Sequence, residues 1–139
     1  MSHLALQRIR FSIEADQRLR TLKGRTGITP NLLCRIAFCV SIEEVGAPLS
    51  DASEMSEREI NRYTLLGEFD QLFVGLLCGR HPEVLDDASG ELTRLFVAHV
   101  HRGLALMANR VKGVPSLLEL VSAVAPHPAH IPRSSTSDQ

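Results

Sequence analysis

The sequence has few aromatic residues and few cysteines, and each shortage excludes a class of site. Aromatic residues make up 4% of the 139 residues, and tryptophan is absent. No aromatic lies among the basic residues 18–25, so bases of a single strand have no rings to stack on there. The three cysteines, Cys34, Cys39 and Cys78, contain no CxxC pair and lie in apolar surroundings, where a thiol packs as a small hydrophobe. We therefore expect no structural metal and no disulfide framework.

The sequence also lacks the common catalytic motifs. It contains no GxSxG elbow, no Walker loop and no dinucleotide-binding fingerprint. His99 and His101 are two residues apart, so on a helix they point to different sides and cannot chelate one ion together. Glu68 and Asp70 begin a predicted helix, where carboxylates favour the positive end of the helix dipole without any catalytic role. We predict no catalytic residue, no metal and no cofactor, and hence a protein that is not an enzyme.

Long apolar runs are missing as well. None approaches the roughly 20 residues that cross a bilayer, and the first ten residues do not resemble a signal peptide. We expect a cytoplasmic protein without membrane contact. Hydrophobic residues make up 44% and charged residues 22% of the chain, as in ordinary globular proteins. We predict one helical domain over residues 1–125 and a disordered tail, rich in proline and serine, over residues 126–139.

The net charge of −1 hides a strong asymmetry along the chain. Residues 1–40 carry a charge of +5, residues 41–91 a charge of −9, and the remainder +3. Such a basic front followed by an acidic middle favours a polyanionic partner, or subunits that meet basic face to acidic face.

Hydrophobic periodicity predicts a mainly α fold. Residues 8–13 alternate between polar and apolar, which predicts a short half-buried strand that needs a partner strand from this chain or another copy. A helix follows, capped by Ser12 and ended by Gly27, and Thr29 then caps a second helix that starts at Pro30 and runs to about residue 44. Further helices are expected over 66–79, over 92–113 with an interruption at Gly103, and from about 115 to 124. Residues 47–57 and 82–90 are predicted to be acidic loops.

The second helix is apolar on nearly every side, so it belongs at the centre of a bundle or at a subunit interface. We therefore predict a small bundle of about five helices with a short N-terminal strand, ribbon-helix-helix-like at its N-terminus. An oligomer is expected for the same reason.

The strongest candidate site is the basic end of the first helix. Arg18, Arg20, Lys23 and Arg25 follow one another with no acid among them, although like charges close together on a helix repel. The turn at residues 27–30 then brings this end next to the start of the second helix. Arginine and lysine side chains together with free amides at a helix start hold phosphate. We predict a backbone contact with duplex DNA here, with Arg35 as a further candidate.

Three segments resemble the DndE family of DNA phosphorothioation, or DNA sulfur modification, proteins: residues 8–44, 59–73 and 98–112. The segments TLKGRTGITPNLLCRIAF and NRYTLLGE carry most of the resemblance. It implies a small helical protein that forms a homotetramer and binds nicked double-stranded DNA through basic residues, without catalysis of its own. It also implies a cysteine desulfurase, an ATP-pyrophosphatase-like enzyme and an ATPase as partners. The family's basic patch corresponds to Arg18, Lys23 and Arg25.

Two other functions stay open. In a ribbon-helix-helix repressor the strand would enter the major groove, with Arg8, Arg10 and Ser12 reading the bases. Alternatively, the chain could be a scaffold whose basic front docks on an acidic partner, without DNA contact.

Overall fold

The computed structural model describes residues 8–49, 54–86 and 90–124. Its elements follow the order β1 (Ile9–Ser12), α1 (Ile13–Thr26), α2 (Pro30–Ile42), β2 (Met55–Ile60), α3 (Arg62–Leu66), a 3-10 turn η1 (Gly67–Phe69), α4 (Asp70–Arg80), a second 3-10 turn η2 (Pro82–Asp86), α5 (Glu91–Arg110) and α6 (Val114–Val124). The predicted mainly α fold with a short N-terminal strand is confirmed. The predicted tail over residues 126–139 lies outside the described residues.

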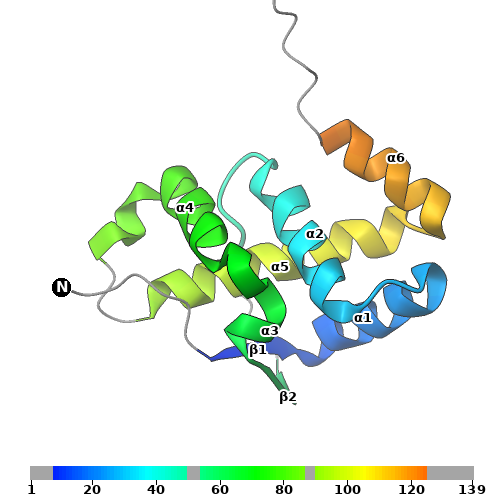
Figure 1. Cartoon of the computed structure of the whole chain (residues 1–139), viewed down its shortest axis with the longest axis horizontal. Helices are drawn as coiled ribbons and strands as arrows, with labels where there is room; N and C mark the ends of the chain where they lie inside the picture. Colours follow the sequence, from blue (N-terminus) through cyan, green and yellow to red (C-terminus); the bar gives the residue numbers. More distant parts are fainter. Residues whose placement is uncertain (1–7, 50–53, 87–89, 125–139) are drawn as a thin grey trace, which may run out of the picture.

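The helices enclose one core built around α2 and α5. Figure 1 shows α5 running lengthwise through the molecule, with β1 and α1 along one edge, α4 along the opposite edge and α6 at the far end. Phe38 of α2 lies at the centre, with its ring 5.1 Å from that of Phe96 and 5.3 Å from that of Phe73. The apolar character of α2 is therefore explained by burial within this chain. Among the described residues, no helix has both the length and the apolar content that crossing a membrane requires.

The predicted strand finds its partner in its own chain. β1 pairs antiparallel with β2 in a two-stranded sheet, in which Ile9 faces Ile60 and Arg10 faces Glu59. The prediction of a loop over residues 47–57 is thus wrong at its end, because Met55 already belongs to β2. A local sequence of small and acidic residues gave no sign of this pairing. Ser12 is 2% exposed and its hydroxyl caps α1, so it is not placed to read bases as a repressor strand would.

The helix predicted over residues 66–79 is in fact two helices. Asn61 caps α3 by accepting a hydrogen bond from the Tyr63 amide at 2.8 Å, so helical structure starts earlier than predicted. Gly67 has a φ of +58°, which ends α3 and allows the 3-10 turn before α4 begins at Asp70. The helix then runs one residue past Gly79, to Arg80.

Gly103 does not interrupt α5, contrary to the prediction. It lies where α5 crosses α2, and a Cβ built on it would be only 1.8 Å from the carbonyl oxygen of Ala37. The glycine is therefore required by the close approach of two helix backbones. The cost of glycine within a helix is offset by the packing that this approach permits.

Candidate nucleic-acid interface

Helix α1 is capped at both ends by the residues that the sequence indicated. The Ser12 hydroxyl accepts a hydrogen bond from the Ala15 amide at 3.1 Å. At the other end Gly27 has a φ of +72°, and its amide donates to the Lys23 carbonyl at 2.8 Å. This left-handed residue ends the helix and turns the chain directly into α2.

Arg18 and Arg20 form ion pairs with acids of α1 itself. Arg18 lies 3.9 Å from Glu14, and Arg20 lies 3.1 Å from Asp16. The Arg20 side chain is 72% exposed and that of Asp16 only 10% exposed. Exposed pairs of this spacing contribute at most about 1 kcal/mol and are screened by salt. The Arg18 guanidinium group can therefore exchange Glu14 for a stronger anion, whereas the partner of Arg20 is a carboxylate largely shielded from solvent.

Lys23 and Arg25 occupy the last turn of α1 and are used differently. Lys23 is exposed, and a cation at this position also favours the negative end of the helix dipole. Arg25 donates from one guanidinium nitrogen to the Ala108 carbonyl at 3.0 Å and the Val111 carbonyl at 3.1 Å. It thus binds the C-terminal end of α5 while it is itself largely exposed to solvent.

Only residues 27–29 separate the last turn of α1 from the start of α2. Pro30 occupies the first turn as predicted, but Thr29 makes no side-chain cap hydrogen bond, so that part of the prediction is wrong. By helix geometry the amides of Asn31 and Leu32 have no intrahelical acceptor. Amides in this position favour an anion.

Arg35 lies apart from the other four candidates. Its Nε donates to the Leu65 carbonyl at 2.5 Å, and its guanidinium group passes beside Gly67. It therefore ties α2 to α3. The other four candidates all lie on α1, whereas Arg35 lies at the contact between α2 and α3.

The other end of α2 carries a polar cluster that the sequence did not indicate. Arg102 donates to the Ser41 hydroxyl at 2.8 Å, to the Ser41 carbonyl at 2.7 Å and to the Gly46 carbonyl at 3.0 Å. Arg80 donates to the Glu44 carbonyl at 3.1 Å. Both arginines thus satisfy carbonyls at the end of a helix.

A buried histidine pair completes this cluster. The Ser41 hydroxyl lies 2.8 Å from Nδ1 of His99, and Nε2 of His99 lies 2.8 Å from Nε2 of His81. Burial, together with His81, Arg102 and Arg80, lowers the pKa of His99 to about 4. The sequence places His81 between a predicted helix and an acidic loop and His99 on another helix, so no spacing signal joins them.

The described residues show no metal-binding or reactive thiol cluster. No group of three or more histidine, cysteine or acidic residues among them could hold a metal ion. Burial raises the pKa of the Cys39 thiol, to which Glu43 adds, and burial also raises the pKa of Cys78. These thiols are therefore protonated at neutral pH and poor nucleophiles.

Comparison with known proteins identifies the family. The family model described as DNA sulphur modification protein DndE matches residues 8–113. Solved structures are similar as well, among them the two that follow, and no curated protein matches the chain. The crystal structure of DndE from Escherichia coli B7A, involved in DNA phosphorothioation modification, is 30% identical with a TM-score of 0.63; the match covers 77% of this chain and 99% of that one. A glycine-to-lysine mutant of DndE involved in DNA phosphorothioation is 29% identical with a TM-score of 0.58, covering 73% of this chain and 96% of that one. The chain therefore belongs to the DndE family of DNA phosphorothioation proteins.

Proposed function

We propose that this protein is a non-catalytic subunit of the phosphorothioation machinery that binds the backbone of nicked or intact duplex DNA. One observation carries the proposal. The short turn at Gly27 links the last turn of α1, which carries the exposed Lys23, to the start of α2, which has no side-chain cap. A cationic side chain and free helix-start amides both favour phosphate, and the short turn between them supports a shared contact with one phosphate group.

We call this proposed phosphate site, formed by Lys23 and the start of α2, the Lys23 seat. The remaining cations of α1 extend it along the helix. Arg18 pairs with the exposed Glu14, so a phosphate can replace this acid at little cost. Arg20 pairs with the largely buried Asp16, but its own side chain is 72% exposed, so its charge adds to the positive potential of this surface. Arg25 keeps two backbone acceptors on α5 and fixes the last turn in place, while its charge adds to the local positive potential. Arg35 contributes charge rather than a direct contact, because its guanidinium group is committed to α3.

The experiment is a binding titration with intact, nicked and single-stranded DNA over a range of salt concentrations. The proposal expects binding to both duplexes with little sequence preference, tighter for the nicked one, and a steep loss of affinity with salt. Lys23→Glu should weaken duplex binding at least tenfold. Arg80→Glu changes the net charge equally on α4, away from the seat, and should have little effect. Equal binding by the Lys23→Glu variant and the unaltered protein would show that the seat lies elsewhere.

The machinery also implies protein partners, and the charge pattern suits them. The acidic stretch over residues 41–91 has a charge of −9, which favours basic surfaces on a cysteine desulfurase, an ATP-pyrophosphatase-like enzyme or an ATPase. Pull-down of each purified candidate at low and high salt tests this assignment. No association with any of them at low salt would contradict it.

A homotetramer is part of the same proposal. Helix α4 presents Phe69 at its start, Leu72 and Leu76 to solvent, 45%, 56% and 42% exposed. Apolar faces of this kind favour association between copies. Sedimentation should show a tetramer, and a variant with Leu72→Glu and Leu76→Glu should dissociate. A monomer at all concentrations would refute this part of the proposal and leave DNA binding untouched.

A further inference from the structure

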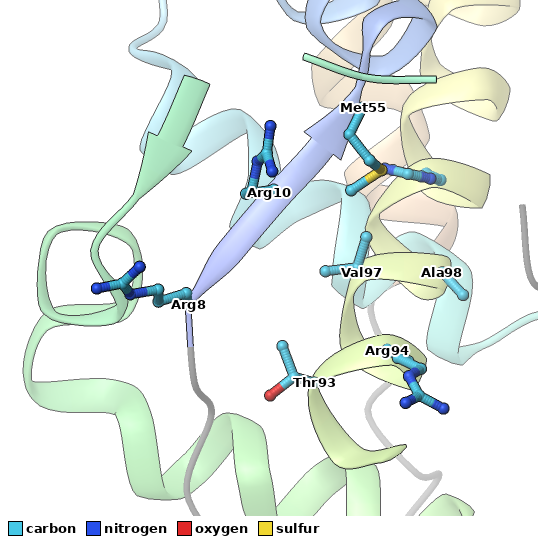
Figure 2. Close-up of a pocket in the computed structure, with 8 residues that line it drawn as sticks. Arg8, Arg10, Met55, Thr93, Arg94, Val97 and Ala98 are labelled. Atoms are coloured by element: carbon cyan, nitrogen blue, oxygen red, sulfur yellow. The ribbon is translucent and has the colours of Figure 1, made fainter. Parts of the chain in front are cut away.

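A second cationic feature lies on the same edge of the molecule, at the opposite end from Lys23. A groove of about 350 Å³ runs between β1 and the first half of α5. Figure 2 shows Thr93 and Val97 projecting from α5 toward β1, with Met55 near the upper end. Apolar side chains and the ring of His101 form its floor, Thr93 lies on the wall made by α5, and arginines lie on the rim.

The floor is apolar and firmly held. Val97, Ala98 and Met55 line it together with the ring of His101. That ring is fixed, because its Nε2 accepts the Ser12 amide hydrogen bond at 3.2 Å and its centroid lies 5.8 Å from that of Phe11. Such a floor suits a flat, weakly polar group rather than a hydrated ion.

The rim is cationic. Arg8, the residue before β1, and Arg94 on α5 stand at its lower end, with guanidinium groups that point away from the groove in Figure 2. Arg10 projects further along β1. Arg8 pairs with Glu59 at 3.2 Å, the side chains being 87% and 44% exposed, and Arg94 pairs with Glu91 at 3.3 Å, at 69% and 56%. Pairs this exposed contribute little to stability and give way to a phosphate, which arginine binds through two parallel hydrogen bonds.

Arg10 differs from the other two, because it also holds the sheet together. Its guanidinium group donates to the Ser56 carbonyl at 3.0 Å across the β1–β2 ribbon. The Arg10 side chain is therefore already ordered at the rim, so binding an anion there costs little further side-chain entropy.

We propose that this groove binds a nucleotide with a terminal phosphate, with the base on the floor and the phosphate at the arginine rim. The volume is at the lower end of the range for small-molecule sites, which is enough for one nucleotide. Two sources have this chemistry: a free nucleotide, and the last nucleotide of a strand that ends at a nick. The second source rests on the proposed function, and it would give the protein a reason to prefer nicked DNA.

The position of the groove fits a shared duplex. Arg94 lines the groove, and the Ala108 carbonyl accepts a hydrogen bond from Arg25 in the last turn of α1, the turn that also carries Lys23. At 1.5 Å of rise per residue, the two points are about 20 Å apart along α5. That distance corresponds to roughly six base pairs of duplex, at 3.4 Å per step on each strand.

Calorimetric titration with thymidine 5′-monophosphate and with thymidine tests the groove without DNA. The monophosphate should bind and thymidine should bind at least tenfold more weakly. Thr93→Glu adds a carboxylate to the wall that faces β1 and should weaken monophosphate binding at least tenfold, whereas the neutral, equally long Thr93→Gln should not. A pair of changes at the rim, Arg8→Gln with Arg94→Gln, should act like Thr93→Glu, and Arg80→Gln on α4 should not. Equal affinities for the Thr93→Glu and Thr93→Gln variants would overturn the assignment.

Duplexes with a 5′-phosphate or a 5′-hydroxyl at the nick identify the source. If a strand terminus occupies the groove, the duplex with a phosphorylated nick should bind more tightly than the one with a hydroxyl. The Thr93→Glu change should abolish this difference. A preference for free monophosphate alone would identify a free nucleotide as the ligand. If neither probe distinguishes Thr93→Glu from Thr93→Gln, the groove is not a nucleotide site, and binding of intact duplex that depends on Lys23 would still support the proposed function. If the unaltered protein binds the monophosphate but no duplex, the proposed function is refuted and the nucleotide groove is not.

Discussion

The α2–α5 contact and the outer surface of α1 both contain glycine and basic residues, but these residues support packing in the first region and remain exposed to solvent in the second. In the first region, Arg102 donates two hydrogen bonds to Ser41 at the end of α2 and one to Gly46 just beyond it, and Gly103 allows the close approach of the Ala37 backbone. On α1, Lys23 is exposed to solvent, and Gly24 has nothing within 4 Å of its missing side chain. The core therefore loses stability when any of these is changed, whereas α1 keeps its stability and loses only its charge. Substitutions in matched pairs separate the two regions.

The two glycines should give the largest contrast. Gly103→Ala places a methyl group 1.8 Å from the Ala37 carbonyl oxygen, so the helices must separate, and we expect a loss of at least about 3 kcal/mol. Gly24→Ala lies within α1 in open space and should instead stabilise the protein by up to about 1 kcal/mol. Urea denaturation of both variants measures the difference. Similar effects at the two positions would mean that α2 and α5 are not in backbone contact.

Acid should destabilise the core through His99. Its pKa is about 4 in the folded protein and near 6.5 when unfolded, so the unfolded chain binds more protons between these values. Stability is therefore fully present above pH 6.5 and falls by about 3 kcal/mol as the pH drops through this window to 4. The groups that face His99 are His81, Ser41 and the two arginines that also lower its pKa.

Denaturation curves at several pH values between 7 and 4 test this expectation. The variant His99→Gln should lose most of the pH dependence in the window, although it is less stable at pH 7. An unchanged pH dependence in the variant would assign the effect to other groups.

Arg102 should come next in magnitude. Replacing it with methionine keeps much of the apolar stem but removes the donors to Ser41 and Gly46, and we expect a loss of about 2 kcal/mol. Arg110→Met on the same helix is a matched control at an exposed position and should change stability by less than about 0.5 kcal/mol. Thermal unfolding of the two variants side by side is sufficient, and equal shifts would show that the end of α2 does not depend on Arg102.

The smallest effect belongs to the ion pair on α1. Arg20→Ala removes an ion-pair partner of the largely buried Asp16, but the Arg20 side chain is itself 72% exposed, and we expect about 1 kcal/mol of lost stability. The same variant should weaken DNA binding and lower its salt dependence by about one phosphate contact. A large loss of stability would place Arg20 with the core residues rather than with the surface.

Local sequence signals predicted the elements that depend on local physics. Ser12, Gly27 and Pro30 act through neighbouring backbone groups, and the boundaries that they set were correct. Local signals do not predict the start of β2 at Met55, because the stability of this strand comes from pairing with β1, 46 residues away at the Arg10–Ser56 bond. Periodicity predicts an interruption at Gly103 because it carries no information about a second helix at the same place.

The candidate site was predictable only in part, for the same reason. The run of cations on α1 is visible in the sequence, but the carbonyls that hold Arg25 and Arg35 come from residues 83 and 30 positions away. The groove between β1 and α5 joins Arg8 with Arg94, which no motif links. The identity of a cation is local information, whereas its partner is set by the tertiary structure.

One small feature, Ser12, determines how these sites relate to each other. It is both the last residue of β1 and the cap of α1, and its amide is bonded to His101 on α5, so no linker separates strand from helix. Arg10 in the strand and Lys23 at the far end of the helix are consequently parts of one rigid unit. The distance between them is fixed, so a ligand that contacts both must adapt its own shape to that distance.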